Sequence, residues 1–428
     1  MKQLILLLAM LTLVGLPPAS AQKGGLTVDA SHSLGVISPY VYGSNFGPWG
    51  IVPLDLLPAA QAAGITFLRF PGGNWGDRYD ITEWQLDFFM NLCDLMNAEP
   101  SIHVRLRGGT PEKAAELVRY ANIEKGYGVR YWAIGNEPNL YDDYDTGQFN
   151  RDWRAIAEAM LAVDPDILLM GPELSQYPPI FIQTPKDRAG RDWMTEFLRA
   201  NGDLVDIISI HRYPFPRQMN RATTIEELLA NPPEWDVIIP NLRALIREVL
   251  GQDLPIAVTE VNSHWSPAFG NPASPDSFHN ALWLADVLGR LARQQVKIVA
   301  QFALQSPSAY GGWGLFGQID VIRPSYYVYQ LYQRFGSELV EATSPDARLT
   351  VYAALREDGA LTLMIINLGE EDRTETLHLS GFTPGGPAEA WRLDTEHAAE
   401  QVESVPVVDG GPITLPGWSA TLLVIPAP

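Results

Sequence analysis

The stretch Val129–Glu137 reads VRYWAIGNE, and Pro138 follows it directly. Tyr, Trp, Ala and Ile suit the interior of a β-strand, whereas proline interrupts a strand ladder. Burial does not explain why a carboxylate should end such a strand. Glu137 is therefore either a reactive group at the mouth of a barrel or a polar strand end that caps the next helix.

Eight apolar runs of this kind, rich in β-branched and aromatic residues, occur along the chain. Amphipathic helical stretches separate them, and the alternation predicts parallel strands joined by crossover helices. Eight such units predict an α/β fold of the (β/α)8 TIM barrel type. An open doubly wound sheet is the alternative, but no glycine-rich phosphate fingerprint follows the first run. The eight runs are Tyr40–Phe46, Ile65–Gly73, Ser101–Arg107, Val129–Glu137, Ile167–Glu173, Val205–Pro214, Pro255–Asn262 and Ile298–Leu304.

The pattern changes after Phe335 to short strand-like runs joined by turns, which predicts a C-terminal all-β sandwich domain. Gly25–Ala30 is a lone strand-like run before the barrel and is expected to join that sandwich. The predicted boundaries are 1–21 for a signal peptide, 22–35 for the N-terminal strand, 36–337 for the barrel and 338–428 for the sandwich. The C-terminal runs are Leu349–Leu355, Leu361–Leu368, Thr374–Leu379, Ala388–Leu393 and Ser419–Ile425.

The N-terminus has the three parts of a secretory signal peptide: a positive charge at Lys2, an apolar core over Leu4–Leu16 and the small residues Ala19–Ala21. This predicts a secreted or periplasmic/extracellular protein with no membrane contact after cleavage. An uncleaved anchor is the alternative, although the apolar run is short for a membrane-spanning helix. The single cysteine, Cys93, gives no disulfide framework and no thiolate metal site.

Charge and composition exclude several classes of partner. The chain has 30 Lys and Arg against 50 Asp and Glu, a net charge of −20, so nucleic acid would be repelled. Twelve Trp and 16 Tyr are many, and flat aromatic faces suit stacking against sugar rings. The seven His lack metal-ligand spacing, and the acidic run Asp142–Asp145 lacks that of a calcium loop. Neither a metal nor another cofactor is expected.

Polar side chains gather where the eight runs end, and barrels of this type place their active sites at that end. Glu137 ends the fourth run and Glu260 the seventh, so the two carboxylates would face each other across the mouth. Such a pair is what glycoside hydrolysis requires, one as acid and one as nucleophile or base. Glu173, which ends the fifth run, is a reserve carboxylate. The full set at the ends is Asn45, Arg69, Asn74, Arg107, Asn136, Glu137, Glu173, His211, Tyr213, Glu260, Asn262 and Gln305.

Several of these motifs resemble known families. Asn136-Glu137-Pro138, together with Glu260 at the end of the seventh run, resembles the clan A glycoside hydrolases, which are retaining (β/α)8 enzymes. VISPYVYGSNFG (36–47) and FLRFPGGNWGDRYD (67–80) resemble α-L-arabinofuranosidases, and IGNEPNLY (134–141) is similar to β-xylosidases and the β-glucuronidase and heparanase-like branch. The resemblance implies a secreted retaining glycosidase acting on polysaccharide or oligosaccharide, most similar to α-L-arabinofuranosidases. A β-xylosidase, a β-glucuronidase or an endo-β-glycanase remains an alternative.

The resemblance also implies roles for individual residues. Glu137 would be the general acid/base, with a raised pKa, and Glu260 the nucleophile of a double displacement. Arg69 matches the arginine that keeps the nucleophile ionised, and Asn136 would hydrogen-bond the sugar 2-hydroxyl. The substrate-binding residues are expected to be Asn136, Arg69, Asn74, Trp75, His211, Tyr213 and Trp313.

Three questions stay open at the level of sequence. A non-catalytic carbohydrate-binding protein could use the same barrel, although binding alone does not require both Glu137 and Glu260. A transglycosylase would use the same two residues. The sugar is also undecided, and Arg107 or Arg212 could supply a basic subsite for a uronate.

Overall fold

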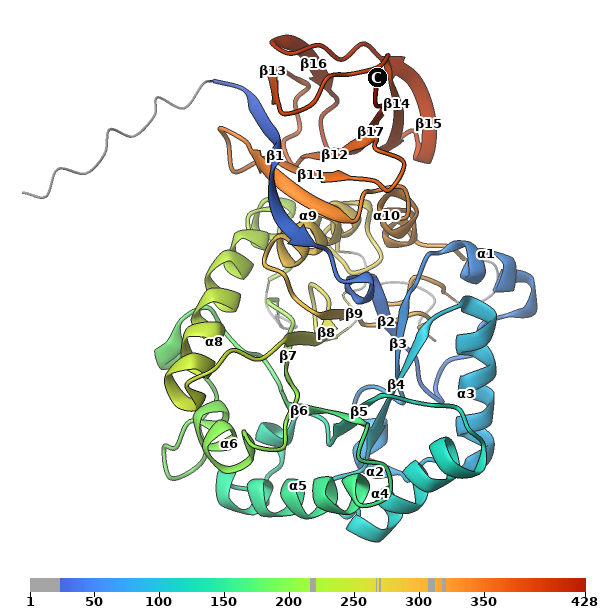
Figure 1. Cartoon of the computed structure of the whole chain (residues 1–428), viewed down its shortest axis with the longest axis vertical. Coiled ribbons are helices and arrows are strands. Elements are labelled where there is room, and N and C mark those ends of the chain that lie inside the picture. The colour runs from blue at the N-terminus through green and yellow to red at the C-terminus, as the bar shows by residue number, and fades with distance from the viewer. Residues whose placement is uncertain (1–23, 216–220, 267, 269–270, 307–311, 318–320) are drawn as a thin grey trace, which may run out of the picture.

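The protein is described by a computed structural model that covers residues 24–215, 221–266, 268, 271–306, 312–317 and 321–428. The predicted signal peptide, residues 1–21, lies outside the described residues. Figure 1 shows a barrel ringed by helices, with a strand-rich unit packed against one of its sides. In the described part of the chain, no helix is both long enough and apolar enough to cross a membrane.

Eight parallel strands close into a barrel in sequential order, from β2 round to β9 beside β2 again. Each predicted run overlaps one of them, so the (β/α)8 prediction is confirmed and the open sheet is excluded. The strands are β2 (Gly43–Asn45), β3 (Phe67–Phe70), β4 (Glu99–Val104), β5 (Tyr131–Ile134), β6 (Leu168–Leu174), β7 (Ile207–Arg212), β8 (Ile256–Val261) and β9 (Ile298–Gln301).

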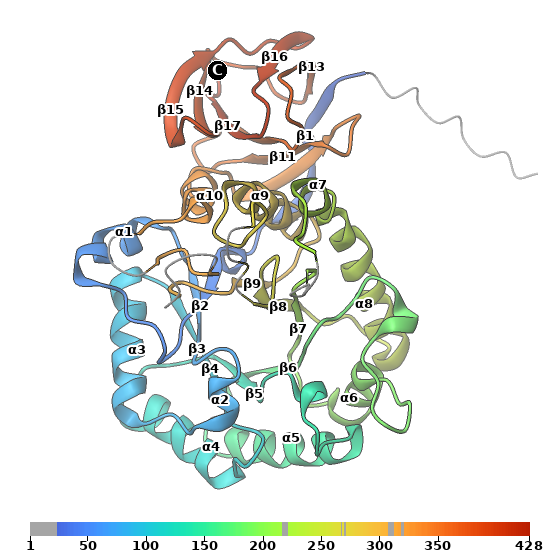
Figure 2. The same ribbon diagram turned by 180° about the vertical axis from the view of Figure 1, so that it is seen from behind.

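Helices cover the outside of the barrel (Figures 1 and 2). Local signals set their ends: Thr82 and Gln85 form a capping box at the start of α3, and Gly251 ends α8 in the left-handed conformation at φ 70°. The helices are α1 (Leu57–Ala62), α2 (Trp75–Arg78), α3 (Glu83–Met96), α4 (Pro111–Val118), α5 (Thr146–Leu161), α6 (Trp193–Asn201), α7 (Ile225–Leu229), α8 (Trp235–Leu250), α9 (Phe278–Arg293) and α10 (Pro324–Tyr332).

The inside of the barrel changes from apolar to polar along its axis. Phe67, Tyr131 and Ile207 belong to an apolar cluster at the N-terminal ends of the strands. Side chains two residues apart share one face of a strand, so Arg69 follows Phe67 and His211 lies four residues beyond Ile207 on the same inner face. Both polar side chains are fully buried. The buried polar side chains of Arg69 and His211 thus stand nearer the mouth than this apolar cluster.

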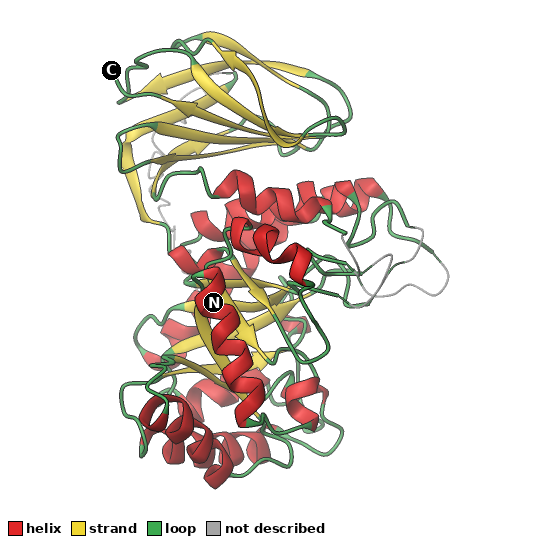
Figure 3. Cartoon of the chain, turned by 90° about the vertical axis from the view of Figure 1, so that its right-hand side faces the viewer, coloured by secondary structure: helices red, strands yellow, loops and turns green. Residues whose placement is uncertain are grey.

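The second unit is a nine-stranded sheet in the order β15-β14-β17-β12-β11-β10-β1-β13-β16, and Figure 3 shows its strands stacked in two layers. The N-terminal strand β1 lies between β10, to which it is antiparallel, and β13, to which it is parallel. The strands are β1 (Leu26–Val36), β10 (Glu338–Thr343), β11 (Leu349–Leu355), β12 (Leu361–Asn367), β13 (Arg373–Ser380), β14 (Ala388–Leu393), β15 (Ala398–Val405), β16 (Gly411–Leu415) and β17 (Ser419–Ile425).

Helices α9 and α10 lie between the barrel and the sheet, with α9 against β11, β12 and β17 and α10 against β14 and β15. A buried polar contact joins the two units: the Tyr352 hydroxyl donates to Asp286 Oδ1 at 2.5 Å, and Arg290 Nε donates to the same carboxylate at 3.0 Å. Packing on both sides explains why α9 is buried almost all round. The sheet thus covers the side of the barrel and leaves the mouth uncovered.

Candidate active site

Glu137 stands just beyond β5, in a backbone conformation that a strand does not use. Gly135 has a φ of 81° and Glu137 a φ of 47°, both in the left-handed region. That conformation costs a non-glycine residue on the order of 1 kcal/mol and is most common at functional sites. Glu137 precedes the short 3-10 helix Pro138–Leu140, yet its side chain makes no described capping hydrogen bond. The structure therefore disfavours the interpretation of Glu137 as a helix cap.

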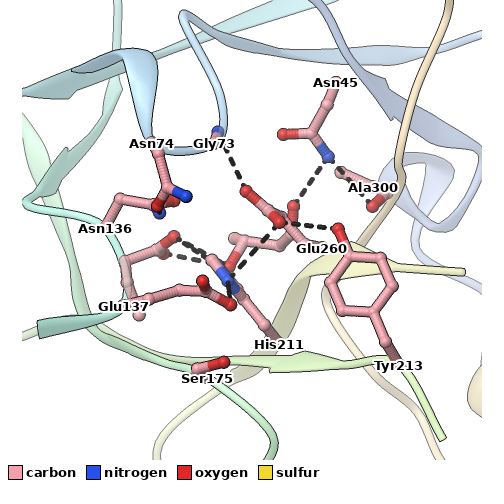
Figure 4. Close-up of polar contacts among 12 residues, drawn as sticks. Asn45, Gly73, Asn74, Asn136, Glu137, Ser175, His211, Tyr213, Glu260 and Ala300 are labelled. Carbon is pink, nitrogen blue, oxygen red and sulfur yellow. Dashed lines mark hydrogen bonds and ion pairs between the residues drawn. The ribbon is translucent and has the colours of Figure 1, made fainter. Parts of the chain in front are cut away.

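Glu260, on β8, is held by three hydrogen-bond donors. Its Oε1 accepts from Arg69 Nη1 at 2.9 Å and from the Gly73 N–H at 2.9 Å. Its Oε2 accepts from the Tyr213 hydroxyl at 2.6 Å. Figure 4 shows Tyr213 and Gly73 approaching the carboxylate from opposite sides. Charge-assisted bonds of this kind fix the position of a carboxylate.

Arg69 is the centre of the buried network behind this carboxylate. Besides Glu260, it donates to Asn45 Oδ1 at 3.0 Å, Asn136 Oδ1 at 3.0 Å and Glu173 Oε2 at 2.7 Å. Burial alone would raise the pKa of Glu173, but the charge of Arg69 and the hydrogen bond from His211 lower it well below its usual range. Glu173 is fully buried, so the reserve carboxylate serves as a fixed counter-charge.

His211 connects the three carboxylates. Its Nδ1 lies 3.2 Å from Glu137 Oε1 and 3.7 Å from Glu260 Oε2, and its Nε2 lies 3.0 Å from Glu173 Oε2. Burial alone would lower the pKa of His211, but the charge of Glu260 and the hydrogen bonds to Glu137 and Glu173 raise it to about 10. At neutral pH the ring is therefore an imidazolium that donates from both nitrogens.

The pKa of Glu137 corrects an expectation from the sequence. Burial alone would raise it, but the hydrogen bond and the charge of His211 lower it below its usual value. The sequence led us to expect a raised pKa, because His211 could not be placed against Glu137 from a position 74 residues away. In the free protein, the proton that His211 and Glu137 share is thus bound to the imidazole of His211.

The cluster also has the geometry of a metal site: one ligand atom each of Glu137, His211 and Glu260 lie within 4.8 Å of one another. A protonated imidazole cannot ligate a metal, because both of its nitrogens carry hydrogen. A cation would have to displace the proton that the surrounding carboxylates stabilise. The donor set therefore fits a proton better than a metal ion at neutral pH.

The raised pKa of His211 predicts how stability depends on pH. The unfolded pKa is about 6.5 and the folded value about 10, so the imidazolium stabilises the fold fully below pH ~6.5. That contribution is lost as the pH rises through about 10. Thermal unfolding of the native protein and of His211→Asn should therefore differ most near pH 6, with the gap narrowing steadily towards pH 10. A gap that stays constant over this range would contradict the assignment.

A pocket of about 620 Å³ opens above these carboxylates. Five residues expected in the site line it: Glu137, Glu260, Asn74, Trp75 and Tyr213. Trp313 lines it as well, with its indole Nε1 donating to the His264 carbonyl at 2.8 Å. The remaining lining residues are Trp49, Gly73, Leu140, Ser175, Gln176, Trp265, Phe302, Ala303, Gln305 and Ser306.

Three expected substrate-binding residues lie behind the pocket wall. Arg69, Asn136 and His211 are fully buried and are not among its described lining residues. Arg69 and His211 bind carboxylates in this structure, as expected for Arg69 from the sequence, and their direct contact with substrate stays a prediction. The Asn136 amide is engaged by Arg69 and, at 3.4 Å, by Asn74 (Figure 4).

The two arginines considered for a uronate subsite are also placed elsewhere. Arg107 pairs with Asp143 at 3.0 Å, and Arg212 pairs with Glu234 at 2.6 Å. Neither arginine is among the described residues that line the pocket, and that described lining contains no Lys or Arg. The described wall therefore offers no cation to a carboxylated sugar.

Sequence reasoning missed a second set of residues that hold the site in place. Asp77, on α2, accepts a hydrogen bond from the Asn136 N–H at 3.1 Å and another from the Tyr141 hydroxyl. Burial raises the pKa of Asp77 to about 7. The pocket residues Trp49 and Trp265 were missed as well, because they lie in loops, where no hydrophobic period identifies a pocket wall.

A closed parallel barrel with two carboxylates facing each other at its mouth, and a buried arginine behind them, is the arrangement expected of a glycoside hydrolase. The chain belongs to the glycosyl hydrolases family 39, whose family model matches residues 119–368. Residues 346–422 also match the model of the C-terminal immunoglobulin-like domain of D-apionate lactonase. The clan-level resemblance of the sequence is thereby confirmed.

Similar proteins of known name include two groups of pentosidases. A β-xylosidase from Geobacillus stearothermophilus is 27% identical over 339 residues, which cover 74% of this chain and 58% of that protein. An intracellular exo-α-(1→5)-L-arabinofuranosidase from Streptomyces lividans is 24% identical over 284 residues, or 51% of this chain and 40% of that protein. The chain thus spans about half the length of these relatives.

Solved structures show the same fold at low identity. A thermostable α-L-arabinofuranosidase from Thermotoga petrophila RKU-1 superposes with a TM-score of 0.77 at 18% identity, covering 94% of this chain and 99% of that one. CelM2, a bifunctional glucanase-xylanase from a metagenome library, gives 0.74 at 20% identity, covering 95% and 100%. These likenesses establish the fold of the barrel with its sheet.

Proposed function

We propose that this protein is a retaining glycosidase that hydrolyses glycosides of neutral pentoses. The observation that carries the proposal is the separation of Glu137 and Glu260, whose carboxylate oxygens approach within 4.8 Å in one pocket. Retaining enzymes hold their carboxyl groups about 5–5.5 Å apart, whereas inverting enzymes need room for a water molecule between them. The spacing supports a covalent intermediate.

In the first step Glu260 attacks the anomeric carbon, towards which its three hydrogen-bond donors hold it in place. The bond from that carbon to the leaving oxygen breaks, and the oxygen takes a proton from Glu137. The imidazolium of His211, whose Nδ1 lies 3.2 Å from Glu137 Oε1, supplies that proton to Glu137, so that Glu137 is again a carboxylate and His211 a neutral ring once the leaving oxygen has been protonated. Forming the ester removes the negative charge of Glu260, which is one of the charges that hold the proton on His211.

In the second step a water molecule gives a proton to Glu137 and attacks the same anomeric carbon. The ester bond to Glu260 breaks, and the sugar leaves with its original configuration. The same carboxylate acts first as an acid and then as a base. Tyr213 is placed to donate to Glu260 as its charge returns.

The proposed sugar is a neutral pentose, with β-xylosides first and α-L-arabinofuranosides second. The described pocket wall has aromatic rings and amides but no Lys or Arg, which speaks against β-glucuronides. The sequence alone favoured arabinofuranosides. Membership of family 39 and the β-xylosidase relative support placing xylosides ahead of them, while the Streptomyces relative keeps the second candidate.

A panel of 4-nitrophenyl glycosides tests the proposal, with NMR to identify the first sugar anomer released. We expect the β-xyloside or the α-L-arabinofuranoside to exceed the β-glucuronide in kcat/KM by roughly 100-fold, with retention of configuration. Release of the inverted anomer would contradict the mechanism, and preference for the glucuronide would contradict the sugar. Binding of the sugars without any release would point to a carbohydrate-binding protein, and dominant transfer to added acceptors to a transglycosylase.

Export from the cell is part of the same proposal. The charge at Lys2, the apolar core and the small residues Ala19–Ala21 support a cleaved signal. The measurement is the first residue of the protein recovered from the culture medium, which should be Gln22.

A further inference from the structure

Aromatic side chains continue from the pocket wall along the outside of the barrel mouth. Trp75 lines the pocket, and its ring centroid lies 5.2 Å from that of Tyr79 at the end of α2. A few residues later, Trp84 and Phe88 stack on the first turns of α3, with centroids 5.8 Å apart and ring planes 22° apart. We call Tyr79, Trp84 and Phe88 the rim strip.

A second series of ring contacts ties the rim strip to the pocket. Phe88 stacks on Phe46 with centroids 6.5 Å apart. Phe46 directly follows β2, and the same loop carries Trp49, another lining residue of the pocket. Figure 2 shows α2 and α3 side by side next to β3 and β4. The strip is thus connected to the pocket through two different loops.

The rim strip is exposed to a degree that folding does not require. Trp84 is 72% exposed, Tyr79 55% and Phe88 44%. Large apolar side chains that cluster on a surface mark a binding site more often than scattered ones do. Trp84 and Phe88 are four residues apart on one helix face, so their rings stack, and Trp84 is the more exposed ring of the pair. Flat aromatic faces of this kind match the C–H faces of pyranose rings.

We infer that the rim strip binds the part of an uncharged polysaccharide that extends out of the pocket. Asp80 and Glu83 lie between Tyr79 and Trp84 in the sequence, and Asp80 is paired with Lys113 and Arg105. The net charge of −20 over the whole chain disfavours an anionic polymer. The choice of a pentose-containing polymer such as arabinoxylan rests on the proposed function. The inference that the rim strip binds a polysaccharide does not rest on the proposed function, because the strip lies apart from the catalytic carboxylates.

The test uses the full chain made inactive by Glu260→Gln, so that binding is measured without cleavage. Electrophoresis through gels containing soluble arabinoxylan, arabinan or xyloglucan should retard this protein. Adding Trp84→Ala and Phe88→Ala should weaken the apparent Kd for the retarding polymer roughly fivefold or more, as expected for loss of a stacked aromatic pair. The matched control is Ile123→Ala, which removes a side chain that is 58% exposed. Ile123 lies in the segment that leads into β5, at the opposite end of the barrel, and its substitution should leave retardation unchanged.

In the active protein, the same double substitution should lower the ratio of kcat/KM on the polymer to kcat/KM on the aryl glycoside about fivefold. The inference is overturned if none of the three polymers retards the inactive protein, or if the double variant is retarded as strongly as its parent. It is also overturned if the strip proves to be a contact between two copies of the chain. In that case the native chain elutes as a dimer in size-exclusion chromatography and the double variant as a monomer. If the polymers retard the inactive protein but the active protein hydrolyses no pentoside, the proposed function is contradicted, while the inference about the rim strip is still supported.

Discussion

Replacing Glu260 with alanine should lower kcat on aryl glycosides by at least ~10⁴-fold, because neither of the other two carboxylates described at the site can reach the anomeric carbon from that side. Glu137 faces the pocket from β5, and Glu173 is buried behind Arg69. Azide is small enough to enter the space left by the side chain. It should restore turnover and yield a glycosyl azide of inverted configuration, which NMR identifies.

Two controls separate chemistry from folding in this experiment. Glu260→Gln keeps the shape of the side chain, so its thermal unfolding shows whether Arg69 tolerates the loss of one of its two carboxylate partners. Glu158→Ala removes a carboxylate from an exposed pair with Arg154, and such pairs contribute little. Its kcat should be unchanged. Normal activity of Glu260→Ala would refute the assignment of the nucleophile.

Glu137→Ala is the second large effect, and it should depend on the leaving group. We expect kcat/KM to fall roughly 10²- to 10⁴-fold for a poor leaving group that must be protonated. For 2,4-dinitrophenyl glycosides the loss should be small, because that group leaves without a proton. Azide should now give a glycosyl azide of retained configuration, since Glu260 still forms the intermediate. Steady-state kinetics over a series of phenols measures the difference.

The structure adds one condition to that expectation. His211 donates to Glu137 Oε1, so removing the carboxylate also leaves the imidazolium with one partner fewer. Glu137→Gln keeps an oxygen at this place and is the matched control for the loss of the hydrogen bond. If both variants lost activity equally for good and poor leaving groups, Glu137 would be a positioning residue and the assignment as acid/base would be wrong.

The sequence was sufficient for the fold because a parallel barrel repeats one local pattern. Each buried strand is a short apolar run, and each crossover is an amphipathic helix, so all eight runs overlap a strand. The pattern failed in the sheet where apolar residues are sparse. Strands β10, β15 and β16 were missed. Strand β10 is short and reads ELVEAT, β15 is mostly exposed and reads AAEQVESV, and β16 contains a proline and has every second residue exposed.

The sequence by itself determined the barrel, the end of it that carries polar groups, and the two carboxylates that face each other there. All three follow from the period of apolar residues and from the position of the residue that ends each run. Only the tertiary structure decided what surrounds those carboxylates. Arg69 and Glu260 lie 191 residues apart in the chain and His211 lies 74 from Glu137, and charges in contact set each other's protonation through distances that no local pattern contains.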